Sequence, residues 1–137
     1  MRLFLDTNII VDILSKREGY ADSLTVLKSC EAGIAEGWVS TATITDVMYI
    51  LRKHIHPQEV RDAVKRLLLI VDVTGVLKSD ISAAFLSDMT DFEDAVQASC
   101  ATRIKTDYIV TRNIKDFINS PIPAILPSNI VKFLNLT

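Results

Sequence analysis

Four carboxylates occupy positions from which they can act together on a bound ligand. Each stands at the edge of an expected helix or strand; they are Asp6, Asp46, Asp94 and Asp116. In open α/β sheets, ligands bind outside the carboxyl ends of the strands. Carboxylates gathered there from distant segments repel one another unless a divalent cation holds them. The pattern therefore indicates Mg²⁺ or Mn²⁺ held by acidic oxygens, a combination that can generate hydroxide and stabilise in-line attack on a phosphodiester.

The segments that must position these acids alternate between short apolar runs and stretches of helical periodicity. The expected strands span residues 2–5, 38–41, 68–73, 108–111 and 124–126. The first is short, does not alternate and is followed at once by Asp6-Thr7-Asn8, as expected for a buried central strand. Alternation of strands and helices is typical of βα units, so we predict an α/β fold with a parallel sheet.

Helical spacing between the strands places acids near the starts of helices. One helix carries apolar residues at i, i+3, i+4 and i+7, namely Ile44, Val47, Met48 and Leu51. Asp46 then projects to a neighbouring face in the first turn of that helix. Asp91 is expected to N-cap the Ala-rich helix that contains Asp94. Gly33 and Gly37 are expected to end the second helix.

Length and composition describe an ordinary globular domain. A chain of 137 residues that is 49% hydrophobic and 23% charged can bury a sizeable core. Its apolar stretches are far shorter than a membrane span, and its first apolar run is too short and too soon acidic for a signal peptide. We therefore expect a cytoplasmic location and no membrane partner. Cys30 and Cys100 are then expected to be free thiols in a reducing compartment.

The net charge of −2 argues against a protein that holds nucleic acid by bulk electrostatics, but it does not exclude a nuclease. Two local basic patches are candidates for such contacts: Arg52-Lys53-His54, and Arg112 with Lys115. Lys53 is interpreted as part of a solvated helix face, and His54 and His56 as residues at a helix end, where positive charge suits the dipole. Arg112 differs because it lies beside the proposed site.

Each acid also has a purely structural interpretation. Asp6 or Asn8 can N-cap the helix that follows, and the acids near helix starts are favoured there by the dipole. Four other acids are interpreted as solvated residues or caps: Asp12, Asp72, Asp80 and Asp88. A phosphoaspartyl transferase would carry a second aspartate where Asn8 stands, which disfavours that activity. However, Asp91, Glu93 and Asp94 place three acids in four residues, which crowds charge beside a tightly packed helix.

Four motifs, taken in order, resemble those of a known family. They are Leu5-Asp6-Thr7-Asn8, Thr43-Ile44-Thr45-Asp46, Asp91-Phe92-Glu93-Asp94-Ala95, and Ile109-Val110-Thr111-Arg112-Asn113 followed by Asp116-Phe117. Together they span essentially the whole chain and resemble a PIN domain, whose small prokaryotic members are commonly the ribonuclease toxins of VapBC-type toxin–antitoxin pairs. The resemblance implies a single domain over residues 1–137 and a three-layer α/β/α arrangement around a five-stranded parallel sheet. It also implies dependence on Mg²⁺ or Mn²⁺ and a homodimer.

The resemblance assigns roles to individual positions as well. The acidic cluster would consist of Asp6, Asp46 and Asp94, with Asn113 or Asp116 in the fourth place. Of these, Asp6 and Asp94 would be the principal metal ligands. The supporting residues would be Thr7, Asn8, Asp91, Thr111 and Asn113, of which the two threonines would orient the carboxylates or a bound water. Arg112 and Lys115 would contact the RNA backbone, which positions a substrate without selecting its sequence.

Two positions depart from the family pattern. The second acid is more often Glu, so Asp46 has roughly 1.5 Å less reach. The fourth position is often Asp, and Asn113 supplies no charge there. Both differences lower the expected metal affinity, because hard cations gain from each added carboxylate. Water molecules retained by Mg²⁺ can bridge the difference.

We therefore expect a metal-dependent endoribonuclease that leaves a 3′-hydroxyl and a 5′-phosphate, with RNA as its substrate and a cognate antitoxin as its partner. Transfer, messenger and ribosomal RNA are all compatible, since nothing in the chain resembles a base-reading module. The alternative that Asp46 and Asn113 favour is a PIN-fold binding module with lost or weakened catalysis. A third interpretation is an α/β domain whose acids only cap helices.

Overall fold

Five parallel strands form one sheet at the centre of the protein, whose computed structural model describes residues 1–134. The strands are β1 (Arg2–Leu5), β2 (Glu36–Ser40), β3 (Asp72–Thr74), β4 (Tyr108–Val110) and β5 (Ala124–Ile125). Their spatial order is β3-β2-β1-β4-β5, and every neighbouring pair is parallel. The parallel sheet predicted from the sequence is therefore confirmed, with its first strand in the middle.

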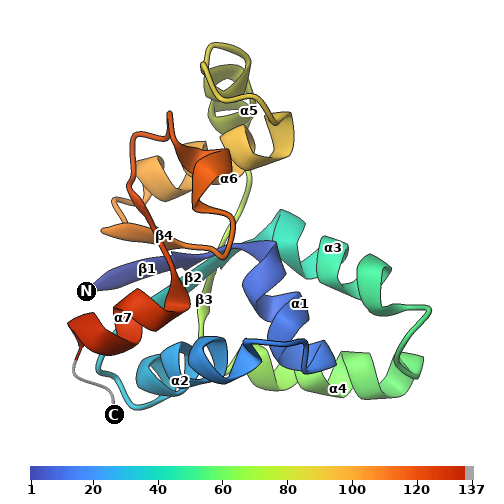
Figure 1. The fold of residues 1–137 in the computed structure, drawn as a ribbon. Coiled ribbons are helices and arrows are strands. Elements are labelled where there is room, and N and C mark those ends of the chain that lie inside the picture. Colours follow the sequence, from blue (N-terminus) through green and yellow to red (C-terminus); the bar gives the residue numbers. More distant parts are fainter. Residues whose placement is uncertain (135–137) are drawn as a thin grey trace.

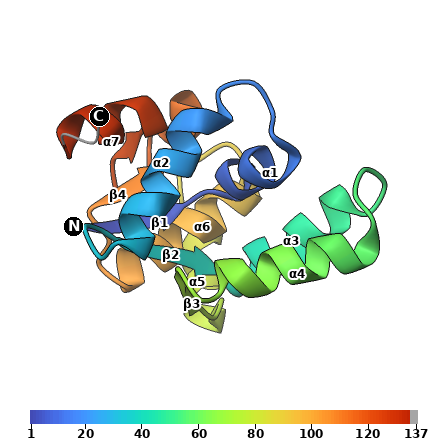
Figure 2. The ribbon, with the colours of Figure 1, turned by 90° about the horizontal axis from the view of Figure 1, so that it is seen from below.

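Within residues 1–134, seven helices and one 3₁₀ turn surround the sheet (Figure 1). They are α1 (Thr7–Ser15), α2 (Tyr20–Glu31), α3 (Thr41–Leu51), α4 (Pro57–Leu67), α5 (Lys78–Phe85), α6 (Phe92–Arg103), η1 (Ile114–Phe117) and α7 (Pro127–Phe133). Figure 1 shows α1, α2, α4 and α7 below the sheet and α5 and α6 above it. Seen from below in Figure 2, α3 and α4 run side by side as an arm that projects from the body. The fold is thus the expected three-layer α/β/α arrangement.

The alternation of side chains along β1 divides the core into two parts. Leu3 and Leu5 point into the cluster formed with α1, α2, α4 and α7, whereas Phe4 points into the cluster formed with α6. All three side chains are completely buried. Because β1 is covered on both faces, its continuous apolar run is the one that a central parallel strand requires.

The register of β1 and β4 positions the functional residues that follow them. Leu5 is paired with Val110, and the backbone N–H of Asp6 donates to the carbonyl oxygen of Val110 at 3.0 Å. Asp6 and Thr111 therefore leave the sheet at the same edge, where the carboxyl ends of all five strands lie. This is the edge at which ligands bind in such sheets.

The strand expected over 68–73 is shorter and later than predicted. Helical turns continue through most of this run, since Leu68 N–H donates to Val64 and Val71 N–H to Leu67, and β3 begins only at Asp72. Leu69 is 87% exposed at this turn. A short apolar run at the end of a helix has the same composition as a buried strand, so periodicity could not separate the two.

The second correction concerns Gly37. Helix α2 ends at Glu31 and Gly33 follows with φ of 76°, so Gly33 behaves as a helix terminator. Gly37 instead lies buried inside β2, where a Cβ would come within 2.9 Å of Cys30 Sγ and 3.1 Å of a Val71 methyl carbon. Its role is to let α2 pack closely on the sheet.

Replacing Gly37 is expected to destabilise the fold. The added methyl group of Gly37→Ala would overpack the contact with Cys30 and lower the free energy of unfolding by about 1–3 kcal/mol. Gly75→Ala is the matched control, because no atom lies within 4 Å of the position of its added Cβ. Urea denaturation of both variants measures the difference; equal stability of the two would contradict the packing role of Gly37.

Candidate active site

Asp6 is held rigidly at the carboxyl edge of the sheet. It occupies the N-cap position of α1 but makes no side-chain capping bond. Its Oδ2 instead accepts a hydrogen bond from Thr111 Oγ1 at 2.8 Å and a longer one from Asn8 Nδ2 at 3.4 Å. Burial raises the pKa of Asp6, while the Thr111 hydroxyl and the charge of Arg112 oppose that shift. The helix-cap interpretation of this side chain is therefore wrong.

Asp94 lies close to other acids that come from distant segments of the chain. It occupies the first turn of α6 and is half-buried. Burial, and after it repulsion from Asp6, Asp91, Asp116 and Glu93, raises the pKa of Asp94 to about 7. The structure thus brings β1, α6 and η1 together into one negatively charged region.

Asp46 joins this region through a residue that was not among the predicted site residues. The pKa of Glu93 is raised to about 7. Burial is the largest cause, followed by a hydrogen bond with Asp46 and repulsion from it, and then by repulsion from Asp91 and Asp6. Glu93 was visible in the sequence only as one of three crowded acids, and its partner on α3 depends on how α3 and α6 face each other.

Asp91 has the capping role that the sequence predicts. Its Oδ2 accepts a hydrogen bond from the backbone N–H of Asp94 at 3.0 Å, which satisfies one of the free donors at the start of α6. Asp91 is exposed, and its charge adds to the repulsion on Asp94 and Glu93. It therefore contributes to the acidic region while fixing the helix that carries Asp94.

A buried polar network lies beneath the acids and connects three segments. The side-chain nitrogen of Gln97 donates to Thr7 Oγ1 at 3.2 Å and to Thr43 Oγ1 at 3.0 Å, while its oxygen accepts from Ser40 Oγ at 3.0 Å. Thr7 and Thr43 are 2.9 Å apart through their hydroxyls. The network ties α6 to the starts of α1 and α3. Thr7 was a predicted supporting residue. Gln97 was not predicted, although a polar residue among the small side chains of α6 was visible in the sequence.

The loop after β4 carries the remaining predicted residues. Thr111 is completely buried, and its Oγ1 accepts a hydrogen bond from the backbone N–H of Asn113 at 3.1 Å. Lys115 and Asp116 are exposed in η1 and line a small pocket of about 220 Å³ together with Asp91. Asp91, Lys115 and Asp116 therefore lie together at one side of the acidic region.

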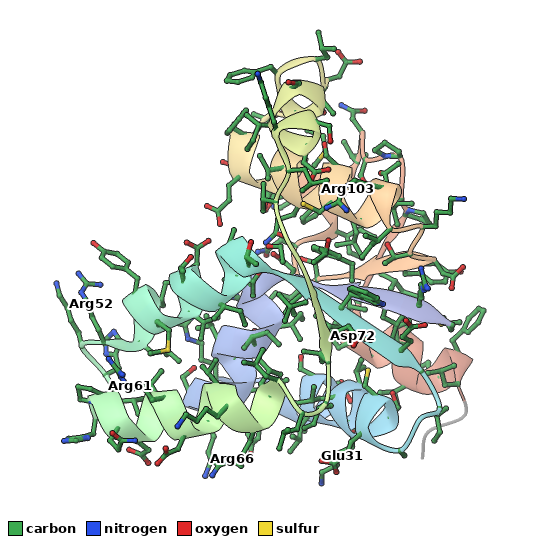
Figure 3. All side chains as sticks on the ribbon, turned by 180° about the vertical axis from the view of Figure 1, so that it is seen from behind. Glu31, Arg52, Arg61, Arg66, Asp72 and Arg103 are labelled. Carbon is green, nitrogen blue, oxygen red and sulfur yellow. The ribbon has the colours of Figure 1, made fainter. Side chains whose placement is uncertain are left out.

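The two predicted basic patches lie in different places. Arg112 is at the acidic region, with its Nε 2.8 Å from Oδ2 of Asp12. Asp12 is only 4% exposed, so its interpretation as a solvated or capping residue is wrong. Arg52 lies at the outer end of the arm formed by α3 and α4, with its guanidinium 3.6 Å from the ring centroid of Tyr49 (Figure 3). Its Nη1 also donates to the Tyr49 carbonyl at 2.6 Å, so it caps the end of α3.

The donor set suits a hard divalent cation. Every acidic group of the region offers oxygen, the ligand that Mg²⁺ and Mn²⁺ prefer, and burial together with the neighbouring carboxylates raises the pKa values of Glu93 and Asp94. Over residues 1–134, no group of three or more His, Cys, Asp or Glu side chains is arranged as a metal site. The oxygen ligands therefore fit the ion in type. Their side chains, however, are spread around the region and do not converge on one point.

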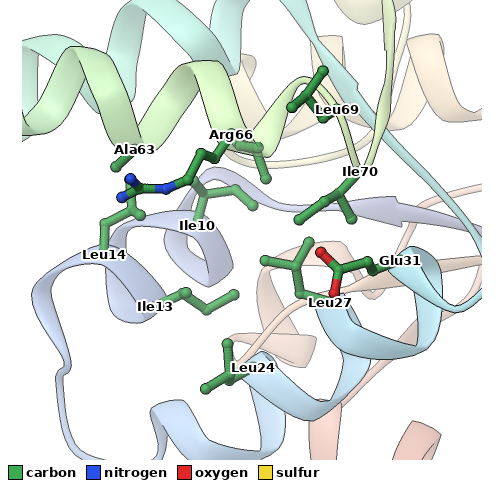
Figure 4. Close-up of a pocket in the computed structure, with 11 residues that line it drawn as sticks. Ile10, Ile13, Leu14, Leu24, Leu27, Glu31, Ala63, Arg66, Leu69 and Ile70 are labelled. Atoms are coloured by element: carbon green, nitrogen blue, oxygen red, sulfur yellow. The ribbon is translucent and has the colours of Figure 1, made fainter.

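An apolar pocket of about 540 Å³ lies away from these acids, between α1, α2 and α4 (Figure 4). Figure 4 shows Ile10, Leu14 and Leu27 inside it, with Glu31 and Arg66 also in its lining. None of the acids at the carboxyl edge lines it. The pocket is consequently separate from the candidate site.

Comparison with known proteins identifies the family. A family model described as PIN domain matches residues 2–115. The chain belongs to the PIN domain family. No curated protein matches it in sequence. No helix within 1–134 has both the length and the apolar character needed to span a membrane.

Solved structures share this PIN fold. VapBC2 from Rickettsia felis, bound to a DNA fragment from its promoter, has a TM-score of 0.71 at 19% identity, covering 92% of this chain and 98% of that one. A toxin–antitoxin complex from Klebsiella pneumoniae has a TM-score of 0.69 at 22% identity, with coverage of 91% and 97%. VapC20 from Mycobacterium tuberculosis, a Sarcin-Ricin loop cleaving toxin, has a TM-score of 0.64 at 15% identity, with coverage of 78% and 86%. At these identities the similarity establishes the fold.

The capping role of Asp91 in this PIN domain can be separated from its charge. Asp91→Ala removes the acceptor for Asp94 N–H and is expected to lower the free energy of unfolding by about 1 kcal/mol. Asp91→Asn keeps an acceptor oxygen and removes the charge, so it should remain close to the parent in stability. Chemical denaturation of the two variants measures this. If Asn destabilises the protein as much as Ala, the capping assignment is wrong.

The acids of the metal-free PIN domain should make its stability depend on pH. The folded state raises the pKa of Glu93 and Asp94 to about 7, above the value of about 4 expected in an unfolded chain. The folded state therefore binds more protons between these values, and the free energy of unfolding should fall as the pH rises from about 4 to about 7 and level off by about pH 8. Thermal melts in the presence of a chelator measure this dependence.

The matched variants are Asp94→Asn and Asp72→Asn. Asp94→Asn removes one repelled carboxyl, so it should raise the melting temperature at about pH 8 and weaken the pH dependence. Asp72 is exposed at the start of β3, at the opposite edge of the sheet, and its replacement should leave the dependence unchanged. A parent protein that is equally stable across this range would contradict the raised pKa values of Glu93 and Asp94.

Proposed function

We propose that this PIN domain is a Mg²⁺- or Mn²⁺-dependent endoribonuclease that acts as the toxin of a toxin–antitoxin pair. The observation that carries the proposal is the gathering of acids from four separate segments at the carboxyl edge of the sheet. These acids are Asp6, Asp46, Glu93, Asp94 and Asp116. Two of them have pKa values raised to about 7, and strongly shifted pKa values cluster at functional sites.

Asp6 and Asp94 would hold the cation, with Asp46, Glu93 and Asp116 or Asn113 around it. When bound, the cation would activate water for in-line attack and offset the charge that develops on the phosphate. Asn113 contributes no charge, but Glu93 adds a carboxylate that the predicted set did not contain. This addition compensates for the two departures from the family pattern.

The protein's own residues orient this acidic region before any ligand arrives. Thr111 fixes the carboxylate of Asp6, and Gln97 holds the starts of α1 and α3 against α6. Such prior positioning lowers the cost of reaching the reactive geometry. Glu93 and Asp94 hold protons near neutral pH and would release them when a cation binds. Arg112 and Lys115 would contact RNA phosphates, which orients the strand without reading its bases.

A cognate antitoxin is the proposed protein partner. The comparisons that support it include a VapBC2 protein and a toxin–antitoxin complex of the same fold. A small reading frame directly upstream of the gene would support this partner. The homodimer that the family resemblance implies and the cytoplasmic location both stay predictions.

The second candidate function is a PIN-fold binding module with weakened catalysis. Asp46, one methylene shorter than the usual Glu, and the uncharged Asn113 favour it. The spread of the acids in this structure is compatible with it too. The two candidates differ in whether the acids bind a divalent cation.

Mn²⁺ binding, measured by the relaxation of solvent water, tests the metal site without a guess about the RNA. The parent should bind Mn²⁺ saturably and more weakly at about pH 6 than at about pH 8, because protons on Glu93 and Asp94 compete with the ion. Asp6→Asn and Asp94→Asn should abolish binding, whereas Asp72→Asn should bind as the parent does. Circular dichroism confirms that each variant is folded. Binding that is absent, or insensitive to these substitutions, favours the binding module.

The same variants test the nuclease. With Mn²⁺ present, the parent should cleave RNA to products that carry a 5′-phosphate, and Asp6→Asn and Asp94→Asn should lose this cleavage. Electrophoresis of labelled RNA, with end-group analysis of the products, measures both properties. Cleavage at the parental rate by either variant would show that the ligand assignment is wrong.

A further inference from the structure

Asp12 is a buried charge that the proposed mechanism does not use. It lies on α1 with 4% of its surface exposed. Its Oδ2 is 2.8 Å from Arg112 Nε, and the nearest counter-charge to its Oδ1 is Arg17 Nη1 at 3.8 Å. Within residues 1–134, Oδ1 has no hydrogen-bond partner. A buried carboxylate with such incomplete pairing stabilises a fold poorly compared with an apolar side chain, so its presence calls for another explanation.

The partner of Asp12 stands at the edge of the acidic region. Arg112 directly follows Thr111, whose hydroxyl holds Asp6, and its charge lowers the pKa of Asp6. The Arg112 side chain is 45% exposed. Its pairing with Asp12 uses Nε, and over the described part of the chain its two Nη groups make no hydrogen bond. A guanidinium has five N–H donors, so four of them stay available to a ligand.

Several nearby carboxylates compete with Asp12 for pairing with Arg112. Guanidinium groups pair with carboxylates through two parallel hydrogen bonds, and Asp6 and Asp116 belong to the nearby acidic region. If Arg112 turned onto those acids, it would occupy the place that a divalent cation needs. Asp12 is buried and lies 2.8 Å from Nε, and low solvent exposure strengthens the attraction between such charges.

We propose that Asp12 is a positioning residue that holds Arg112 at the rim of the acidic region, leaving its Nη groups for an RNA phosphate and the carboxylates for the cation. The inference rests on the proposed function and adds to it the means by which positive and negative groups are kept apart. The competing explanation is a structural ion pair that joins α1 to the loop after β4. The two explanations differ in what happens when both partners are removed.

The test compares Asp12→Ala, Arg112→Ala and the double variant by Mn²⁺ binding. Asp12→Ala frees Arg112 to pair with the acids, so the Mn²⁺ affinity should fall by roughly tenfold, as expected for one added positive charge near the site. Arg112→Ala should bind Mn²⁺ at least as tightly as the parent. The double variant should recover the parental affinity, because no cation remains to compete. Loss of a structural ion pair would instead leave the double variant as weak as Asp12→Ala.

A second readout needs no metal. A fluorescein-labelled single-stranded RNA of mixed sequence is titrated in a chelator at several salt concentrations, and the slope of log affinity against log salt is measured. Arg112→Ala should reduce the slope by about 0.7, the value for one phosphate contact to a single strand. Asp12→Ala should reduce it equally, and the double variant should show no further reduction.

Two further variants complete the design. Arg17→Ala is the matched control, since Arg17 approaches the other oxygen of Asp12 without reaching hydrogen-bond distance, and it should change neither readout. Asp12→Asn keeps the size of the side chain and replaces Asp12→Ala if the latter does not fold. The inference is overturned if Asp12 variants keep parental Mn²⁺ affinity and salt slope, or if the double variant does not regain the parental Mn²⁺ affinity. A parent that binds no Mn²⁺ would refute the proposed function, and the salt slopes would still decide the role of Asp12.

Discussion

Repulsion among carboxylates at one edge of a parallel sheet is the constraint on which the rest of this structure depends. Asp6 is far from Glu93 and Asp94 in the sequence, and the pKa values of all three acids are raised where their two segments meet. Asp6 is buried and Asp94 half-buried, so less water screens the charges there and each acid increases the cost of ionising the next. A fold can maintain such an arrangement only if other interactions hold the segments together more strongly than the charges drive them apart.

Those interactions are supplied by packing on both faces of the central strand and by a polar network under the acids. Leu3 and Leu5 enter one core cluster and Phe4 the other, which fixes β1 between the two helical layers. Ala95 and Ala98 let α6 approach the sheet closely, and Gln97 between them reaches Thr7 and Thr43. A satisfied buried network of this kind specifies one arrangement of its partners, and here it holds α6 against the starts of α1 and α3.

Three arginines have partners other than the acids at the carboxyl edge of the sheet. Arg112 is paired with Asp12 on α1, and Arg103 on α6 is paired with buried Asp80 on the far side of the same helix layer. Arg52 lies at the end of the arm, folded over Tyr49. The net charge of −2 conceals this division, since it averages an acidic edge with cations that are held elsewhere. The local arrangement, and not the total, determines which ligands the surface attracts.

The sequence by itself determined the features that depend on neighbouring residues. The strand at 2–5, the cap formed by Asp91 and the order of the acids along the chain all follow from local spacing and propensity. The start of α3 does not, since α3 begins at Thr41 and Asp46, expected in its first turn, lies beyond that turn. The tertiary structure alone decided that residues 68–71 continue the end of a helix, that Gly37 lies inside β2, that Glu93 meets Asp46 and that Asp12 is buried against Arg112. These outcomes depend on strand register and on which helix faces meet. Such contacts join residues tens of positions apart, and no local pattern encodes them.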